Sequence, residues 1–395
     1  MSDWKTCAVS DSFINNKGGR KNQIPAKDIT QVGRFPVIDQ GQEFIAGYCD
    51  DENKVIDFDL PLIIFGDHTR CFKFVDFPFV LGADGTKVLL PNKKLYDPRF
   101  YFFALLALDL PSRGYNRHFK TLKERCLPLP PLPEQKKIAH ILSTVQRAIE
   151  AQERIIQTTT ELKKALMHKL FTEGIRNEPQ KKTEIGLVPE SWDVAELGAL
   201  AKVGNGSTPK RSNQAYWEGG NIPWLNSTKI HDRFITEADQ FVTPHAIKEC
   251  HLPKVASNSL LIAITGQGKT LGNSAITRIE TCINQHLAYA QFYSAKIVPD
   301  FVLWFMQTRY DYLRSIAHGG GSTKGALTCS FLKTLPIPIP STDEQEEIVT
   351  TFHALDEKQG LAVAKQIVLQ DLFRTLLHEL MTANVRVVST IESTE

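Results

Sequence analysis

The sequence lacks the cysteine pairs that zinc ribbons and disulfide frameworks need. Its seven cysteines are scattered between Cys7 and Cys329, and no two of them form a Cys-x-x-Cys pair. Closely spaced pairs are the usual signature of structural zinc and of small disulfide-stabilised folds. We therefore expect reduced thiols, no metal site, and domains that depend on ordinary apolar cores in a reducing compartment.

Long hydrophobic runs are also missing. No stretch approaches the roughly 18 consecutive apolar residues of a membrane helix. Residues 1–13 do not place a basic segment before an apolar one, as a signal peptide would. Hydrophobic residues make up 42% and charged residues 23% of the chain, which is an ordinary globular composition. The sequence predicts a cytoplasmic protein of two or three domains.

A strong excess of one charge is absent as well. The chain has 46 basic and 44 acidic side chains, so its net charge is only +2. Residues 341–395 contain four basic and ten acidic side chains, which leaves the first 340 residues with a net charge of +8. This distribution excludes a histone-like basic field but is compatible with local contacts to nucleic acid.

No catalytic motif is complete. The run 265–270 resembles a phosphate-binding loop, but Ala263 stands where the pattern requires the first glycine. The combination of Pro299-Asp300 with Asp356-Glu-Lys358 resembles a nuclease motif only weakly, and its second part lies in a helical pattern. The sequence contains no HExxH, no GxSxG and no Asn/Asp-Pro-Pro-aromatic run of an adenine methyltransferase. We predict no catalytic residue.

An internal repeat organises the chain. Two proline-rich stretches, 127–133 and 335–340, each lead into a Glu-Gln pair and then into a long helical pattern, with an offset of 210 residues. Ser341 and Glu344 have the spacing of a capping box, and Gly174 falls opposite Asn384 as a helix stop. In both helices, positions four and three residues apart form a mostly apolar seam, which is typical of a coiled coil. The seam positions are Ile138, Leu142, Val145, Ile149, Gln152, Ile156, Thr159, Lys163, Leu166 and Leu170, and Ile348, Phe352, Leu355, Gln359, Ala362, Gln366, Leu369, Phe373, Leu376 and Leu380.

The segments before the two helices have a globular pattern. Short β-branched and aromatic runs such as 62–65 and 260–264 alternate with Gly, Asp, Asn and Pro, as in mixed sheets. Each segment opens with a tryptophan, and each contains an aromatic stretch with helical character, 97–103 and 299–305. The predicted fold class is α+β, with two globular α/β domains alternating with two long helices that pair as an antiparallel coiled coil. The predicted boundaries are 1–133 and 186–340 for the globules, 134–185 for the central helix and linker, 341–383 for the C-terminal helix, and 384–395 for a disordered tail.

Polar loops in both globules have residue types that suit DNA. Amide and guanidinium groups can read base edges, while lysines and backbone N–H groups hold phosphates. A solvated turn is the competing interpretation for each loop of the first globule, and core packing is the competing interpretation for Trp217 and Trp224. In the first globule the candidates are Lys17, Arg20, Lys21, His68, Thr69, Arg70, Arg113, Tyr115, Arg117 and His118. In the second globule they are Asn205, Ser207, Thr208, Lys210, Arg211, Asn226, Lys229, Gln267, Lys269, Ser322, Thr323 and Lys324.

These motifs together resemble the specificity (S) subunits of type I restriction–modification enzymes. The paired Leu-Pro-x-Pro…Glu-Gln helix entries and the Trp192…Leu197 opening are typical of that family. So are the run Gly-Ser-Thr-Pro209…Tyr-Trp217…Ile-Pro-Trp224 and the segments 65–69 and 114–119. The resemblance covers roughly residues 3–383. The first globule lacks the Thr-Pro…Tyr-Trp…Pro-Trp run, so we expect the two domains to recognise different sequences.

The resemblance implies a non-catalytic, prokaryotic DNA-recognition subunit. Each globule would read one half of a bipartite asymmetric site, and the helices would set the spacing. Double-stranded DNA, methyltransferase (M) subunits and restriction (R) subunits would be its partners, with S-adenosylmethionine, ATP and Mg on the partner subunits. The residues expected to dock partners or to space the domains are Glu134, Gln135, Ile138, Leu142, Leu166, Glu344, Gln345, Ile348, Phe352 and Leu376. A second hypothesis is a coiled-coil scaffold whose globules bind proteins.

Overall fold

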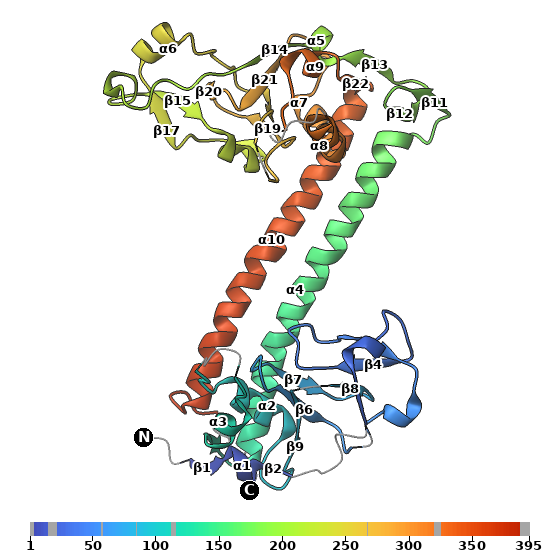
Figure 1. Cartoon of the computed structure of the whole chain (residues 1–395), viewed down its shortest axis with the longest axis vertical. Helices are drawn as coiled ribbons and strands as arrows, with labels where there is room; N and C mark the ends of the chain where they lie inside the picture. Colours follow the sequence, from blue (N-terminus) through green and yellow to red (C-terminus); the bar gives the residue numbers. More distant parts are fainter. Residues whose placement is uncertain are drawn as a thin grey trace, which may run out of the picture. The chain divides into compact units, whose positions relative to one another are not determined.

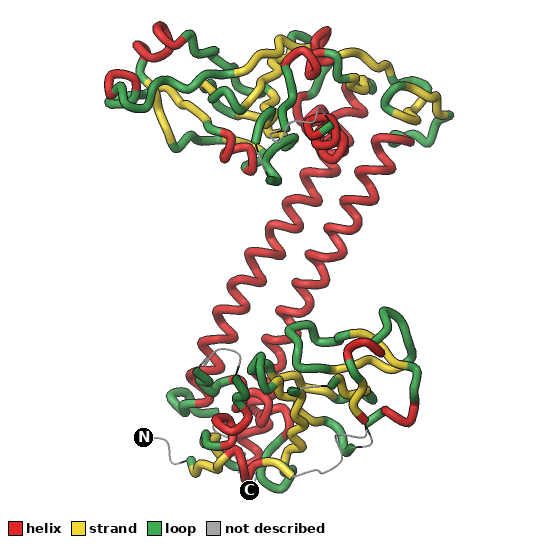
Figure 2. The backbone as a smooth tube through the Cα atoms, viewed as in Figure 1, coloured by secondary structure: helices red, strands yellow, loops and turns green. Residues whose placement is uncertain are grey.

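The structure is a computed structural model that describes residues 4–14, 22–56, 58–83, 85–111, 116–266, 268–319 and 325–387. The chain divides into two compact units. The first unit comprises residues 1–154 and 362–395, and the second comprises residues 155–361. Each unit contains one globule and the adjoining ends of the two long helices α4 (Leu132–Glu173) and α10 (Thr342–Met381), which are labelled in Figure 1 and drawn red in Figure 2.

The first unit contains two four-stranded sheets, ordered β2-β9-β6-β7 and β3-β8-β4-β5, and the strand pair β1–β10. Its strands are β1 (Lys5–Ala8), β2 (Phe13–Ile14), β3 (Gln23–Ile24), β4 (Phe35–Ile38), β5 (Gly47–Cys49), β6 (Leu62–Gly66), β7 (Phe72–Val75), β8 (Val80–Gly82), β9 (Thr86–Pro91) and β10 (Cys126–Leu129). Its shorter helices are α1 (Val9–Ser12), α2 (Pro98–Leu106) and α3 (Phe119–Lys123). One face of β6 packs with α2 in a core that includes Phe65 and Phe103, and the other face packs with the second sheet around Ile64.

The second unit contains a five-stranded sheet, ordered β14-β21-β18-β19-β16, and a three-stranded sheet, ordered β17-β15-β20. Its strands are β11 (Gln180–Thr183), β12 (Gly186–Pro189), β13 (Asp193–Glu196), β14 (Ala201–Asn205), β15 (Ile222–Leu225), β16 (Phe234–Ile235), β17 (Gln240–Val242), β18 (Leu260–Ala263), β19 (Ser274–Thr277), β20 (Cys282–Ile283), β21 (Leu287–Phe292) and β22 (Pro336–Ile339). Its shorter helices are α5 (Leu197–Leu200), α6 (Pro244–Cys250), α7 (Pro299–Thr308), α8 (Tyr310–His318) and α9 (Cys329–Lys333). The expected boundary between 185 and 186 falls inside the hairpin of β11 and β12.

The helices α4 and α10 pack against each other in antiparallel order. In the first unit Gln366 donates to Glu153, and in the second unit Gln359 donates to Thr160. A residue farther along α4 therefore contacts a residue nearer the start of α10. All twenty predicted seam side chains are buried or half-buried. The four–three spacing in the sequence therefore identified the packed stripe of each helix, and the predicted fold class is confirmed.

The two helix ends differ from the expected motifs. The Ser341 hydroxyl accepts the backbone N–H of Glu344 at 3.3 Å, as predicted, but the Glu344 carboxylate does not close the capping box. It accepts N–H groups from Trp192 and Ile175 instead, because a buried carboxylate needs donors from the globule. Gly174 has the expected left-handed backbone with φ of +65°, whereas after α10 the left-handed residue is Ala383 and not Asn384.

The chain after α10 makes contacts up to the last described residue. Arg386 donates to both carboxylate oxygens of Glu134, at 2.8 and 3.1 Å, and its guanidinium lies 5.3 Å from the ring of Trp4. Val387 packs against the core of the first unit. Arg386 and Val387 are therefore held against the first unit and do not belong to the disordered tail expected from 384 onward, because a partly buried carboxylate holds the arginine. Residues 388–395 lie outside the described part of the chain.

Candidate nucleic-acid interface

The Glu-Gln pair at the start of each long helix fastens that helix to its globule. The Gln135 side chain accepts the Asp97 N–H and donates to the Leu95 and Pro130 carbonyls, all at 2.8–2.9 Å. The Gln345 side chain repeats this pattern with Val298, Lys296 and Pro340 at 2.8–3.0 Å. Both glutamine side chains are fully buried. The repeat seen in the sequence is thus a repeated set of hydrogen bonds that positions each globule.

These contacts correct part of the docking prediction. Leu166 and Leu376 are half-buried in the packing of the helices. The other eight residues that were expected to dock partners or to space the domains are buried inside the chain, which leaves them inaccessible to a partner. They are Glu134, Gln135, Ile138, Leu142, Glu344, Gln345, Ile348 and Phe352. These side chains hold the helices to the globules, because the apolar ones pack in the core and the polar ones form hydrogen bonds within the chain. The exposed large apolar side chains of the two helices are Ile155 and Leu162 in α4 and Leu361, Val363, Ile367, Val368 and Leu372 in α10.

The second unit brings four loops to one side of its sheets. β14 and β18 both end beside the start of β21. β15 and β20 run parallel and end together. The loops that follow these strands therefore lie on the same side. Their described residues are 206–211, 226–229, 264–266, 268–273 and 284–286. We call these loops the second polar edge.

Polar side chains form a connected group on the second polar edge. The Thr208 hydroxyl donates to the side-chain oxygen of Gln285, whose amide nitrogen lies 3.3 Å from Nε2 of His286. Nδ1 of His286 shares a 2.5 Å hydrogen bond with the Thr265 hydroxyl. Gln285 and His286 are exposed. Amide, imidazole and hydroxyl groups can both donate to and accept from base edges.

The loop that carries Thr208 is held close to this group. The N–H groups of Gly206 and Ser207 donate to the carbonyls of Leu287 and Ile283 at 3.3 and 3.0 Å. A Cβ on Gly206 would overlap the Ile283 carbonyl oxygen, so the close approach requires glycine. The Asn205 side chain next to it is exposed. Asn205, Ser207 and Thr208 therefore lie together on the second polar edge.

Arg211 stacks on two tryptophans at the side of this edge. Its guanidinium lies 3.9 Å from the ring centre of Trp217 and 4.8 Å from that of Trp224. Trp224 is buried and donates to the Ser207 carbonyl at 3.2 Å, whereas half-buried Trp217 donates to the carbonyl of exposed Lys210 at 3.3 Å. The tryptophans thus support the loop through packing, and the cations remain at the surface.

Two predicted contact residues of the second unit hold their own loop. The Asn226 side chain accepts the Thr228 N–H at 2.9 Å and caps a short 3₁₀ turn. Lys229 forms ion pairs with Asp232 at 2.9 Å and Asp239 at 3.5 Å. The hydrogen bond to Asp232 raises the pKa of Lys229. Both side chains therefore stabilise their own turn and are not free to contact DNA in this structure.

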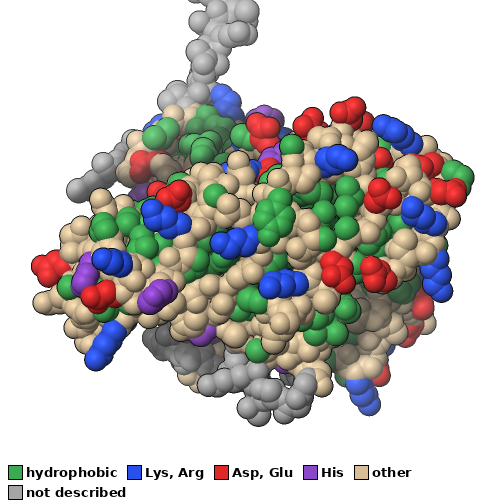
Figure 3. Space-filling model, turned by 90° about the horizontal axis from the view of Figure 1, so that it is seen from above, with side chains coloured by type: hydrophobic (Ala, Val, Ile, Leu, Met, Phe, Trp, Pro, Cys, Tyr) green, Lys and Arg blue, Asp and Glu red, His purple; other side chains and the backbone are tan. Residues whose placement is uncertain are grey.

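Lys269 is exposed on the second polar edge. Its carbonyl accepts the Tyr310 hydroxyl at 2.7 Å and the Asn273 amide at 3.0 Å, so the backbone is fixed while the ammonium group faces solvent. Gln267, Ser322, Thr323 and Lys324 lie outside the described residues. The face in Figure 3 shows lysine and arginine scattered singly among other side chains rather than gathered in one basic field.

The first unit has a smaller polar edge at the turn between β6 and β7. Gln40 accepts the His68 N–H at 3.2 Å with its side chain and the Thr69 hydroxyl at 2.5 Å with its carbonyl. Asp67 is buried and accepts the N–H of Phe119 at 2.7 Å, at the start of α3. We call the side chains of Gln40, His68, Thr69 and Arg117 the first polar edge.

Some of the DNA-contact residues predicted in the first unit are accessible at the surface, and others stabilise the turn between β6 and β7. Arg117 is exposed, and His68 and Thr69 are half-buried. Arg70 has a left-handed backbone with φ of +62°, and its guanidinium donates to the Leu110 carbonyl at 2.6 Å. His118 is buried, and its N–H donates to the Asp67 carbonyl at 2.9 Å. Arg70 and His118 therefore support the turn. Lys17, Arg20, Lys21, Arg113 and Tyr115 lie outside the described residues.

Sequence reasoning missed Gln40, Thr265, Gln285 and His286. One signal was available, since Asn284-Gln-His286 is a polar triplet between two buried strands. No group of three or more metal-ligating side chains occurs among the described residues. The helices that the structure describes include none that is long and apolar enough to cross a membrane.

Comparison with known proteins places both halves of the chain in one family. The model of the type I restriction modification DNA specificity domain matches residues 1–160 and 189–370. The chain is 24% identical over 344 residues to the type I restriction enzyme EcoR124I/EcoR124II specificity subunit of Escherichia coli, covering 85% of this chain and 83% of that protein. It is 27% identical over 325 residues to a protein of Methanocaldococcus jannaschii provisionally named the type I restriction enzyme MjaX specificity subunit, covering 78% and 73%.

Solved structures show the same fold. The crystal structure of the type I restriction–modification system S subunit from M. genitalium matches with a TM-score of 0.64 at 18% identity, over 96% of both chains. A chain from work on complex assembly and conformational transition of the type I restriction–modification system matches with a TM-score of 0.51 at 16% identity, over 96% of this chain and 97% of that chain.

Proposed function

The chain belongs to the specificity subunits of type I restriction–modification systems and carries two DNA specificity domains, and from this premise we propose that each unit reads one half of a bipartite DNA site. The observation that supports this division is the polar edge that occurs in each unit next to its central sheet. Each edge offers amide, hydroxyl and imidazole groups held by backbone contacts. Direct reading of base edges in the major groove requires groups of this kind.

The two halves of the site differ in sequence in this proposal. The second polar edge is built around Gln285 and His286 and is flanked by Arg211 on its tryptophans. The first polar edge is built around Gln40 and His68 and has no such stacked arginine among the described residues. Because base recognition depends on the donor and acceptor pattern, different edges select different bases. The target is asymmetric.

The long helices set the distance between the two half-sites. One heptad of an α-helix rises about 10 Å, which equals about 3 base pairs of B-DNA at 3.4 Å each. The packed seam keeps the two helices in register, so their length acts on the spacing and not on the bases recognised.

Methyltransferase subunits dock on the exposed apolar side chains of the helices, and restriction subunits join that complex. The apolar side chains Val363, Ile367, Val368 and Leu372 of α10 are exposed in the first unit, and Ile155 and Leu162 of α4 are exposed in the second. Exposed apolar groups of this kind are typical of interaction surfaces. S-adenosylmethionine, ATP and Mg belong to the partner subunits. This chain is non-catalytic, and the complex acts in the prokaryotic cytoplasm.

Paired variants in the reconstituted methyltransferase complex test this function. Gln285→Ala is expected to relax base preference in one half-site only, and His68→Ala in the other half-site only. Removing one side chain that reads a base edge costs about 1–3 kcal/mol of discrimination. Lys202→Ala, an exposed substitution within β14 rather than on the polar edge, serves as the control. Sequencing of methylated adenines gives the result. Relaxation of both halves by either variant would overturn the assignment of one half to each unit.

The scaffold hypothesis makes a different prediction. A coiled-coil scaffold with protein-binding globules would bind duplex DNA without preference for sequence. Affinity for the target duplex that falls steeply with salt and exceeds affinity for unrelated duplex separates the two hypotheses.

A further inference from the structure

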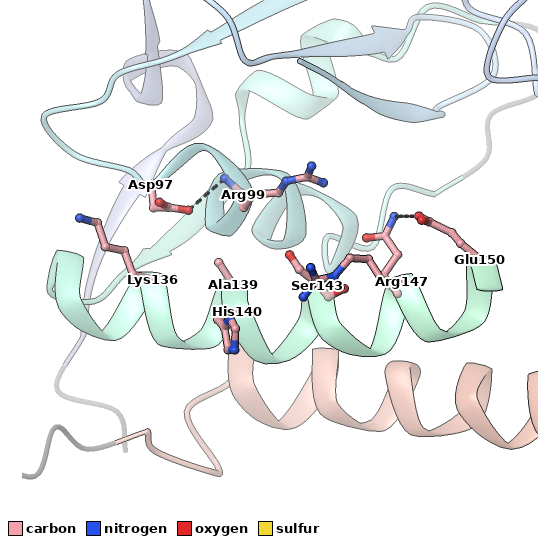
Figure 4. A pocket seen from close by; sticks show the side chains of 9 residues that line it. Asp97, Arg99, Lys136, Ala139, His140, Ser143, Arg147 and Glu150 are labelled. Carbon is pink, nitrogen blue, oxygen red and sulfur yellow. Dashed lines mark hydrogen bonds between the residues drawn. The ribbon is translucent and has the colours of Figure 1, made fainter. Parts of the chain in front are cut away.

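A groove of about 510 Å³ lies in the first unit between α2 and the first turns of α4 (Figure 4). Asp97 and Arg99 line it at the start of α2. Ser143, Gln146, Arg147 and Glu150 line it from α4. Lys136 lies near the start of α4. The groove is separate from the first polar edge and from the exposed apolar side chains of α10.

Each lining residue has a counterpart in the second unit. The helix offset of 210 residues pairs Ser143 with His353 and Gln146 with Asp356. The matching glutamine contacts pair Asp97 with Val298, so Arg99 corresponds to Asp300. The second unit therefore contains a surface equivalent to the groove of the first unit.

In the second unit this surface is covered by β16. The ring of Phe234 stacks on His353 with a centroid distance of 5.1 Å. Arg233, just before β16, forms an ion pair with Asp356 and lies 4.5 Å from the ring of Trp304. Strand β16 itself pairs in parallel with β19. An extended segment thus fills the counterpart of the groove.

The described part of the first unit has no strand that corresponds to β16. Ile63 of β6 pairs with Phe74 of β7 and Leu89 of β9, as Leu260 of β18 pairs with Ile276 of β19 and Ala290 of β21. β7 therefore corresponds to β19. Its sheet ends at β7, whereas the sheet of the second unit continues from β19 to β16. Among the described residues, no strand pairs with the outer edge of β7.

Several equivalent positions around the two surfaces have side chains of opposite charge. In the second unit Arg278, after β19, pairs with Asp300 of α7 at 2.6 Å. In the first unit Asp76, after β7, pairs with Arg99 of α2 at 3.2 Å. On the long helices Lys136 and Arg147 stand where Glu346 and Glu357 stand in the repeat. Neither Lys136 nor Arg147 forms an ion pair with the residues that the structure describes.

We infer that the groove binds an extended acidic segment of a protein partner, which adds a strand to the edge of β7 and places carboxylates against Arg147 and Lys136. The identity of that partner, a methyltransferase subunit, rests on the proposed function. The second unit is the template, because there Arg233 of the covering segment pairs with Asp356 of α10. In the first unit the groove holds the cations Lys136 and Arg147, beside the carboxylates of Asp97 and Glu150. A strand edge presents alternating backbone N–H and C=O groups, which match the backbone of another extended peptide.

Site-specific photo-crosslinking in the reconstituted S–M complex tests the inference. A benzophenone amino acid at position 143 is expected to crosslink to an acidic segment of the methyltransferase subunit, identified by mass spectrometry. The same amino acid at position 353 is the matched control, and it is expected to crosslink within the chain to residues 233–235. Adding Arg147→Glu is expected to lower the yield at 143 about tenfold, and Arg147→Lys to retain most of it.

Each other result overturns the inference. Crosslinks from position 143 to DNA, to a second copy of this chain or only within the chain would do so, as would an unchanged yield with Arg147→Glu. Methylation of a bipartite site by the same preparation would leave the proposed function standing in all these cases. Absence of such methylation would overturn the proposed function and not the docking of an acidic segment.

Discussion

The indole nitrogen of Trp192 donates a 3.1 Å hydrogen bond to the carboxylate of Glu344. In the other unit Trp4 donates to Glu134 at the same distance. Both bonds join the residue that opens a globule to the first turn of the helix that follows it. This contact, together with the hydrogen bonds of Gln135 and Gln345, fastens each globule to the helix that follows it. The chain uses this arrangement twice.

Trp192→Phe is expected to lower the free energy of unfolding of the second unit by about 1–3 kcal/mol. The phenyl ring keeps much of the packing, but the buried Glu344 loses a charge-assisted donor. Trp4→Phe, at a half-buried position where Arg386 still pairs with Glu134, is the matched variant and should cost less. Both free energies of unfolding can be measured by urea titration, with amide hydrogen exchange reporting on each unit separately. A larger loss from Trp4→Phe would contradict this account.

Because of Lys163, the free energy of unfolding is expected to rise with pH. Burial and the neighbouring Arg233 lower the pKa of Lys163 to about 8. The ordinary value is about 10.4, so between these values the unfolded chain holds more protons than the folded chain. The free energy of unfolding should therefore gain on the order of 1 kcal/mol from this residue between pH 8 and pH 10.

Lys163→Met is the control for that titration. Its unfolding free energy, measured by urea titration at pH 7.5, 8.5 and 9.5, should lack this rise. The comparison is between the two pH slopes, so any constant loss from the Asp356 contact at 2.5 Å cancels. Equal slopes for the variant and the wild-type chain would show that Lys163 does not titrate in this range.

Removal of one heptad from both helices is expected to shorten the spacer of the DNA site by about 3 base pairs and to leave both half-sites unchanged. The matching segments are 153–159 in α4 and 360–366 in α10, because Glu153 contacts Gln366 and Thr160 contacts Gln359. Deletion from α4 alone breaks this register and should destabilise the chain. Methylation sequencing that shows altered half-sites with the old spacing would refute the role of the helices.

Val368→Ser combined with Leu372→Ser is expected to weaken methyltransferase binding at least tenfold without changing the stability of the chain. Both side chains are exposed, at 65% and 43%, so their loss removes partner contacts and not core packing. Gln370→Ser, at an exposed polar position on the same helix, is the control. Sedimentation of the mixed subunits measures the complex. Full assembly with the double variant would move the docking surface elsewhere.

The sequence predicted what is periodic and local. The seam positions, the aromatic helices α2 and α7 and the start of each long helix follow from apolar spacing and from repeated motifs. The second polar edge could not be predicted in full, because Thr208, Thr265 and Gln285 meet only through the order of β14, β18 and β21 in one sheet.

The surroundings of several side chains could not be predicted from the motifs that contain them. Glu134 and Glu344 occupy matching positions of the repeat and were expected to dock partners or to space the domains. Both carboxylates accept hydrogen bonds from the tryptophan of their own unit instead. Asn226 and Lys229 look like DNA contacts and hold their own turn, because Asp232 and Asp239 lie close to the lysine. The absence of a strand like β16 from the described part of the first unit depends on sheet order and has no signature in the repeat.

Genome-wide mapping of methylated adenines in the host, with and without the gene for this chain, tests the central claim most directly. The account predicts one asymmetric motif made of two short specific halves separated by a fixed number of unspecified base pairs, and its loss when the gene is removed. A continuous or palindromic motif that depends on the gene, or no gene-dependent motif at all, would contradict the account.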